Sequence, residues 1–321
     1  MNMPSEEAQP AQAVHQETPT TTAIPTNPIR RIFVGPDGLR TFWKLAIFIG
    51  LWRVLVSVAG FVLHSLHVQL RATEFTVRTD IIRDGLAFAT VMAATFVMAK
   101  FEKRSLGDYG LPLRGAFGLR FFEGLLWGFV AECATMFTLY LTGNANFQGF
   151  DQQGKAAVYY AVGWGIAFLM VGFFEESLFR GYPQFTLARS AGFWPAALII
   201  STLFGLAHMP NQGETWIGGL SAGLSGLVMC VSLRLTGKLW FAVGLHAAWD
   251  WAETYFFGVA DSGMPASGHL LNTTFSGSKW MTGGTVGPEG SVVELLVVSA
   301  LIGLLFLRFG REKPRLSAPL S

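Results

Sequence analysis

Charge is scarce in this chain of 321 residues: lysine and arginine number 23, aspartate and glutamate 21, and together they make up 14% of the sequence. Hydrophobic residues account for 51%, and the mean hydropathy is +0.42. Soluble domains carry about 25% charged residues. The composition therefore argues against a large soluble α/β core, in which strands, turns and polar helix faces would recur.

Cysteine is almost absent as well. The two cysteines, Cys133 and Cys230, lie within apolar stretches, which excludes a disulfide framework, and no C-x-x-C pair offers metal or redox chemistry. The sequence also lacks a basic face with interleaved aromatic residues, so we expect no nucleic-acid partner.

Long apolar runs are present instead. A transmembrane helix needs about 20 residues, and several stretches reach that length. We therefore predict an all-α polytopic membrane protein with about eight transmembrane helices, surrounded by the lipid bilayer. The predicted spans are about 42–66, 84–101, 119–141, 157–187, 194–210, 214–233, 238–257 and 291–309.

The two ends of the chain differ from this membrane domain, which we place at residues 41–310. Residues 1–40 are rich in Pro, Thr, Gln and Ala and are predicted to be a disordered cytoplasmic tail, and 311–321 a second cytoplasmic tail. We expect the first span to act as an uncleaved signal anchor. Lysine and arginine favour an orientation with both termini inside, in a bacterial cytoplasmic membrane. Only these basic residues then fall in outside loops: Arg71, Arg78, Arg83, Lys155 and Lys279.

The fourth span carries ionisable residues that a bilayer disfavours, in the segment FFEESLFRGYP. Glu176 and Arg180 are four residues apart, so they share a helix face and can pair. Glu175 points about 100° away from that face. A structural ion cluster at a helix end explains this segment equally well when it is considered alone.

Two further spans carry ionisable residues. His208 follows Phe204 by one turn in FGLAHMPN, and His246 precedes Asp250 by one turn in GLHAAWDW. A lone histidine in an apolar helix is more often a packing residue than a catalyst. At 1.5 Å per residue, however, Glu175, His208 and His246 lie roughly 18, 20 and 12 Å from the inner ends of their spans. The three groups are thus predicted to meet in one intramembrane cavity.

The ordered set E-E-x-x-x-R, F-x-x-x-H and H-x-x-x-D resembles the CPBP family of intramembrane endopeptidases, named for CAAX protease and bacteriocin processing and also called the abortive-infection family. Its best-known branch is the type II CAAX prenyl proteases. The motifs here are EESLFR, FGLAH and HAAWD, and the resemblance covers about residues 105–257, including LGDYGLPLR. It implies a protease core that cleaves a membrane-associated protein or peptide. A prenylated CAAX tail, a peptide leader and another membrane protein all stay open as substrates.

The resemblance also implies catalytic roles. Glu175 is the general base that activates a water molecule, since a carboxylate in an apolar cavity becomes a usable base near neutral pH. His208 helps to hold that water. His246 hydrogen-bonds the developing oxyanion. The prenyl-protease branch has Asn where this chain has Asp250, and an ionised Asp cannot donate to an oxyanion. Asp250 is therefore expected to fix the tautomer of His246, or to donate only when protonated.

Supporting roles fall to Glu176 and Arg180, which are expected to orient their helix, and to Phe204 beside the histidine of its own span. No cofactor is expected, because the H-E-x-x-H zinc signature is missing. A zinc ion held by Glu175, His208 and His246 is the alternative.

Two other classes of protein compete with the protease interpretation. An ion-coupled membrane transporter can use buried Glu, His and Asp as a proton relay, and a non-proteolytic membrane scaffold can keep the fold without the activity. The stretch Gly258–Gly290 is rich in Gly, Ser and Thr and is predicted to be a mobile loop. A lid over the outer end of the bundle is the second interpretation of that stretch.

Overall fold

The computed structural model describes residues 28–36, 38–68 and 76–311, in two compact units divided between Trp43 and Lys44. In the first unit, helix α1 (Pro28–Phe33) precedes the antiparallel strands β1 (Val34–Gly35) and β2 (Gly38–Leu39). These elements fall within the predicted disordered tail. Residues 1–27 and 37 of that tail, and residues 312–321 of the second tail, lie outside the described residues.

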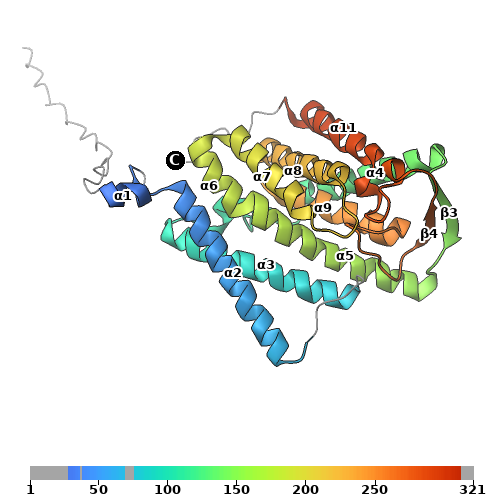
Figure 1. Ribbon diagram of the computed structural model, residues 1–321, viewed down its shortest axis with the longest axis horizontal. Helices are drawn as coiled ribbons and strands as arrows, with labels where there is room; N and C mark the ends of the chain where they lie inside the picture. The colour runs from blue at the N-terminus through green and yellow to red at the C-terminus, as the bar shows by residue number, and fades with distance from the viewer. Residues whose placement is uncertain (1–27, 37, 69–75, 312–321) are drawn as a thin grey trace, which may run out of the picture. The chain divides into compact units, whose positions relative to one another are not determined.

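Helices build the second unit (Figure 1). Helix α2 (Thr41–Ser65) begins in the first unit and continues in the second. The other long helices are α3 (Val77–Phe101), α4 (Leu119–Leu141), α5 (Gly154–Glu176), α6 (Tyr182–Ala191), α7 (Phe193–His208), α8 (Trp216–Thr236), α9 (Trp240–Trp251) and α11 (Val292–Phe309). Shorter elements are η1 (Leu106–Tyr109), η2 (Ser177–Gly181), η3 (Ala252–Phe257), α10 (Lys279–Thr282), η4 (Pro288–Gly290) and the strands β3 (Ala145–Phe150) and β4 (Leu271–Phe275).

The all-α membrane architecture is confirmed. Six helical stretches of the described residues are long and apolar enough to cross a membrane: 41–65, 77–101, 119–141, 154–191, 216–236 and 292–309. The fifth and seventh predicted spans correspond to α7, with 16 residues, and to α9, with 12 residues extended by η3. These two helices are shorter than a full span, so the count of eight stays a prediction.

Helix α3 begins at Val77, seven residues before the predicted span, because its charged residues are paired. Arg83 lies 2.8 Å from both Asp80 and Asp84, on the same helix. Thr76 caps the first turn, since its hydroxyl accepts from the backbone amide of Thr79 at 3.4 Å. Because these charges pair within the helix, α3 includes charged residues that hydropathy alone would place outside the span.

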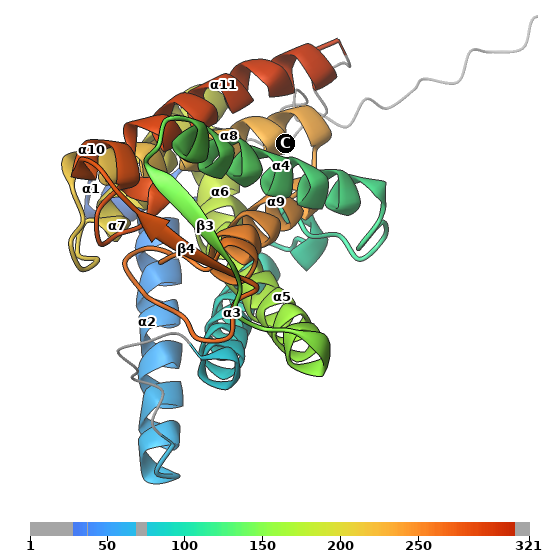
Figure 2. The ribbon, with the colours of Figure 1, turned by 90° about the vertical axis from the view of Figure 1, so that its right-hand side faces the viewer.

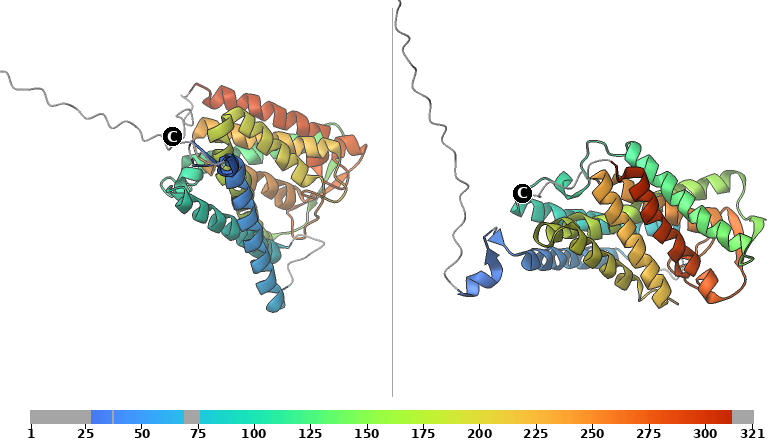
Figure 3. Two further views of the ribbon diagram at one scale, coloured as in Figure 1. Left: turned by 60° about the vertical axis from the view of Figure 1, so that its left-hand side comes forward. Right: turned by 90° about the horizontal axis from the view of Figure 1, so that it is seen from above.

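Helix α9, which carries one of the motifs, packs closely on α4. A Cβ atom at Gly124 or Gly128 of α4 would collide with the backbone carbonyls of Phe241 and Leu245 on α9. Small residues four apart are the usual means by which membrane helices bring their backbones together. On another side of the unit, α8 packs between α7 and α11 (Figure 3).

Two π-helical segments lie beside or within the motifs. The segment η2 continues α5 directly after Glu176 and leads into α6, and η3 continues α9 directly after Trp251. Such segments occur often at functional sites, because the wider turn changes the direction in which neighbouring side chains point. Gly192, with a φ of 83°, then ends α6 and allows α7 to begin at once.

The stretch Gly258–Gly290 is partly regular, in contrast to the plain loop that we predicted. Its strand β4 pairs antiparallel with β3, with Ala145 opposite Phe275 (Figure 2). Helix α10 and the turn η4 follow within the same stretch. The pairing fastens this connection to the chain segment that follows α4.

Glu102, directly after α3, joins several helices near one end of the unit. Its carboxylate accepts hydrogen bonds from Tyr109, Tyr182 and Arg189, each at 2.8 Å, and pairs with Lys44 at 3.3 Å. Burial alone would raise the pKa of Glu102, but the hydroxyl groups of Tyr182 and Tyr109 and the charges of Lys44 and Arg189 lower it below its ordinary value of 4.5. The ionised form therefore stabilises the fold.

Replacing Glu102 by glutamine is expected to destabilise the protein by about 2–3 kcal/mol at neutral pH, because charged hydrogen bonds are lost around a buried group. A lowered pKa in the folded state stabilises the protein above pH 4.5 and loses that effect as the pH falls further. The difference in thermal midpoint between wild type and Glu102→Gln should accordingly be constant above pH 4.5 and shrink below it. Asp151→Asn, at a side chain that is 34% exposed, is the control. An equal difference at every pH would contradict the assignment.

Candidate active site

Glu176 and Arg180 form the predicted ion pair. Arg180 Nη1 donates to Glu176 Oε1 at 3.1 Å, and both side chains are fully buried. The guanidinium carbon of Arg180 also lies 4.1 Å from the centroid of the Phe204 ring, a cation–π contact that joins η2 to α7. The pair is therefore part of the protein interior.

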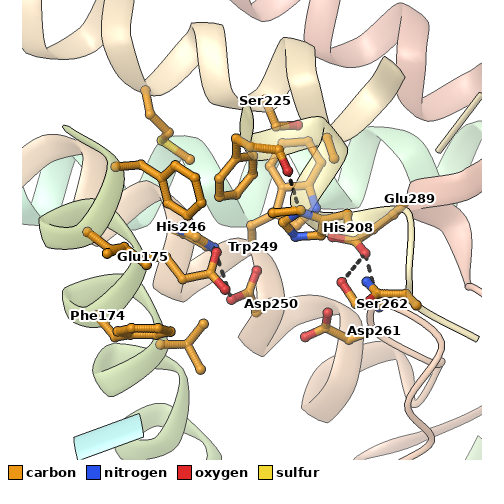
Figure 4. Close-up of a pocket in the computed structure, with 18 of the residues that line it drawn as sticks. Phe174, Glu175, His208, Ser225, His246, Trp249, Asp250, Asp261, Ser262 and Glu289 are labelled. Carbon is orange, nitrogen blue, oxygen red and sulfur yellow. Dashed lines mark hydrogen bonds and ion pairs between the residues drawn. The ribbon is translucent and has the colours of Figure 1, made fainter. Parts of the chain in front are cut away.

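His246 on α9 is surrounded by carboxylates (Figure 4). Its Nδ1 lies 3.0 Å from Glu176 Oε1. Its Nε2 lies 3.7 Å from Glu175 Oε2 and 3.6 Å from Asp250 Oδ2. Because Glu176 occupies the Nδ1 side, this residue, and not Asp250, is placed to hold a proton on Nδ1. Three carboxylates thus lie around one imidazole ring.

His208 lies on the same cavity but does not join this group directly. Its Nδ1 is 2.8 Å from the carbonyl oxygen of Phe204. A carbonyl only accepts, so Nδ1 carries the proton and Nε2 of the neutral ring is an acceptor. The Phe204 ring lies 4.5 Å from the His208 ring and 6.3 Å from the His246 ring. In the described part of the chain, no hydrogen bond connects His208 to Glu175 or His246.

A cavity of about 700 Å³ lies among the motif helices. Glu175, His208, His246 and Asp250 all line it. The side chain of Glu175 is 23% exposed, whereas its Oε2 is buried toward His246 and has no hydrogen-bond partner among residues 28–36, 38–68 and 76–311. The prediction that these groups share one cavity is confirmed by their positions. Their chemical roles stay proposals.

The stretch Gly258–Gly290 contributes to the wall of this cavity. Asp261, Ser262, Met264 and Glu289 line it together with the motif residues, and Figure 4 shows Asp261, Ser262 and Glu289 beside Asp250. The stretch thus forms part of the cavity wall, and the lid over the outer end of the bundle stays a prediction.

The arrangement does not suit the alternative zinc site. Zinc binds nitrogen, oxygen and sulfur ligands at about 2.0–2.3 Å, so its ligand atoms must lie close together. Glu175, His208 and His246 do not bring three such atoms within 4.8 Å of one another, and in the described ranges this spacing is found for Glu253, Asp261 and Glu289. We therefore derive no catalytic step through a metal ion.

Residues 157–252 match the family model described as Type II CAAX prenyl endopeptidase Rce1-like. The chain carries an Rce1-like domain. The resemblance that the motifs indicated is confirmed, over a shorter range than the predicted core at 105–257. At the level of the family, the Rce1-like domain is that of a CAAX-protease-like intramembrane endopeptidase, and the helices around it make the chain an integral membrane protein. No curated protein matches the chain.

The sequence analysis missed three buried carboxylates of the helical unit. Glu132 on α4 and Glu253 on η3 are fully buried, and Glu294 on α11 is 1% exposed. Each lies within an apolar span, so the rule that singled out Glu175, an ionisable residue where a bilayer is expected, applies to them equally. Asp261 gave no such signal, because it lies in a polar connection.

Proposed function

We propose that this protein hydrolyses a peptide bond in a membrane-associated protein or peptide, with a water molecule activated by Glu175. The supporting observation is the pairing of a partly exposed, cavity-lining carboxylate with His246, whose second nitrogen is held by the buried Glu176–Arg180 pair. A base and a hydrogen-bond donor thus lie side by side on a rigid support, as hydrolysis of an amide requires.

The proposed reaction begins when Glu175 accepts a proton from water. The hydroxide formed attacks the carbonyl carbon of the scissile bond, and the oxyanion accepts a hydrogen bond from Nε2–H of His246. Glu175 then gives its proton to the leaving amine, the carbon–nitrogen bond breaks, and the carboxylate returns to its ionised form. His208, with Nε2 as acceptor, orients the attacking water. Proton transfer of this kind contributes about 100- to 10,000-fold to the rate.

The positions of Glu176 and Asp250 around His246 favour a role for Asp250 that differs from the one expected from the sequence. Glu176 lies at Nδ1 of His246 and Asp250 lies 3.6 Å from Nε2. In this proposal, Glu176 keeps the proton on Nδ1, and Asp250 stabilises the positive charge of a doubly protonated His246. Asp250 then needs no proton of its own, which removes the difficulty of an ionised Asp as an oxyanion donor.

The function is tested by proteomic comparison of membranes from cells that express wild type, Glu175→Gln or the surface variant Asp151→Asn. Wild type and Asp151→Asn should produce the same new protein termini, and these should be absent with Glu175→Gln. Identical termini in all three would overturn the proposal. Their absence in all three would favour the transporter or scaffold interpretation.

Substrates are expected to enter from the cytoplasm or sideways from the inner leaflet. The cavity wall includes Ile49 of α2 and Leu203 of α7, each 49% exposed, whereas the stretch Gly258–Gly290 lies at the predicted outer side. In a variant without Cys133 and Cys230, single cysteines at the lining positions of Leu178→Cys and Ala207→Cys should react with a membrane-impermeant thiol reagent in inverted vesicles. Labelling only from outside intact cells would overturn the orientation or the direction of access.

A further inference from the structure

A second group of three carboxylates lies next to the cavity, and two of its members line it. Glu253 on η3, Asp261 in the following turn and Glu289 on η4 each offer an oxygen within 4.8 Å of the oxygens of the other two. Glu253 and Asp261 are buried, and Glu289 is half-buried. Three negative groups at this spacing repel one another strongly unless a proton or a cation lies among them.

Glu253 is the member that points most directly to a ligand. Its side chain is fully buried, and neither carboxylate oxygen has a hydrogen-bond partner in the part of the chain that the structure describes. Burial of an unpaired carboxylate is among the costliest arrangements in a protein interior. Glu132, on the neighbouring helix α4, is also fully buried and likewise has no partner for either oxygen within the described ranges.

Two further features around these carboxylates suit a bound cation. Glu289 Oε2 accepts hydrogen bonds from the amide of Ser262 at 3.0 Å and from its hydroxyl at 2.9 Å, which fixes the carboxylate as an acceptor. Gly287, with a φ of 106°, leaves room for a further oxygen: a Cβ atom there would collide with the carbonyl of Ala260 and lie 3.2 Å from Glu253 Oε1. The carbonyl oxygen of Ala260 and Glu253 Oε1 therefore both lie next to Gly287.

The spacing suits calcium. Calcium binds oxygen ligands at about 2.3–2.6 Å, so any two ligands of one ion lie no more than about 5 Å apart, and it accepts backbone carbonyls and irregular geometry. Zinc and copper prefer nitrogen or sulfur ligands, which this group lacks. Asp261 and Glu289 line the cavity, so an ion has a path to the group.

We infer that Glu253, Asp261 and Glu289 form a binding site for a hard divalent cation, foremost calcium. The ion fastens the stretch Gly258–Gly290 to η3, and η3 continues the helix that carries His246 and Asp250. The site is separate from the proposed catalytic group and contains no histidine. Its role is to hold the wall of the cavity in place.

The test uses full-length protein purified in an uncharged maltoside detergent and stripped with a calcium chelator, with equilibrium dialysis against radioactive calcium. Wild type should bind one calcium ion per chain, and its thermal midpoint should rise as calcium is added. Glu253→Gln and Asp261→Asn should each weaken binding by at least about tenfold, because each removes a charged ligand. Glu214→Gln, at another carboxylate of the cavity wall, and Glu175→Gln should bind as wild type does.

Three outcomes would overturn this inference. Wild type that binds no calcium at millimolar concentration, while Glu253→Gln raises the thermal midpoint, would show that the carboxylates share protons instead. Equal binding by wild type, Glu253→Gln and Asp261→Asn would place the ion elsewhere. Loss of binding in Glu175→Gln would assign the ion to the catalytic group. Since the readouts are binding and unfolding, failure here leaves the proposed proteolysis untouched.

Discussion

Glu175→Gln is expected to slow peptide-bond cleavage by about 100- to 10,000-fold while the protein folds as wild type does. Glutamine has nearly the same shape but cannot accept the proton of the attacking water. The side chain is 23% exposed and its Oε2 makes no hydrogen bond within the described residues, so little structural stabilisation is lost. The measurement is single-turnover cleavage, in nanodiscs, of a substrate found by the proteomic comparison, with the thermal midpoint recorded for the same samples.

The accompanying control addresses metal dependence. Wild-type cleavage should persist in 1,10-phenanthroline, which removes zinc but leaves calcium bound elsewhere largely untouched. Full cleavage by Glu175→Gln would exclude the glutamate mechanism. Cleavage that is lost with the chelator and restored by zinc would replace it with a metallopeptidase mechanism.

Arg180→Ala is expected to destabilise the fold by about 3–5 kcal/mol, because it leaves Glu176 buried without its cation. The substitution also removes the guanidinium from the face of the Phe204 ring, at 4.1 Å. The amount of folded protein recovered from membranes should fall far below that of Glu175→Gln. Thermal unfolding of detergent-solubilised protein, followed by tryptophan fluorescence, gives the difference.

A double variant separates the buried charge from lost packing. Arg180→Met with Glu176→Gln removes both charges and keeps much of the volume, so it should recover part of the stability. It should not recover cleavage, since Glu176 also holds Nδ1 of His246. Arg180→Ala protein as abundant and heat-stable as wild type would show that the ion pair contributes nothing to the fold.

Contacts between residues close in the sequence could be predicted at this site. Contacts between distant parts of the chain could not. Glu176 and Arg180 are one helical turn apart, so their pairing follows from helix geometry alone. The contact of Glu176 with His246 joins residues 70 positions apart. It depends on how α5 crosses α9, which periodicity does not determine. The sequence assigned the tautomer role, or donation when protonated, to Asp250 because an ionised Asp cannot donate to an oxyanion, and it gave no sign that Glu176 lies at Nδ1 of His246.

Hydropathy predicted the helices well and their charged ends poorly. The predicted start of the second span, at residue 84, excluded Asp80 and Arg83, whose charges lower the hydropathy of that turn. In the folded helix these charges pair with one another, so the helix begins at Val77. The acidic group at Glu253, Asp261 and Glu289 was hidden for a different reason, since its members come from three elements that only the fold brings together.

Two features of the protein can be changed independently by substitution: the position of α9, which the contact with α4 fixes, and the side chains of the cavity wall. Gly124 and Gly128 hold α9 backbone against backbone, whereas Ile49 and Leu203, exposed residues of the cavity wall, lie on α2 and α7. Side chains such as Ile49 and Leu203 can therefore be exchanged without altering the contact that holds the helix bearing His246. Any side chain larger than hydrogen at either glycine would instead shift that helix and His246 with it.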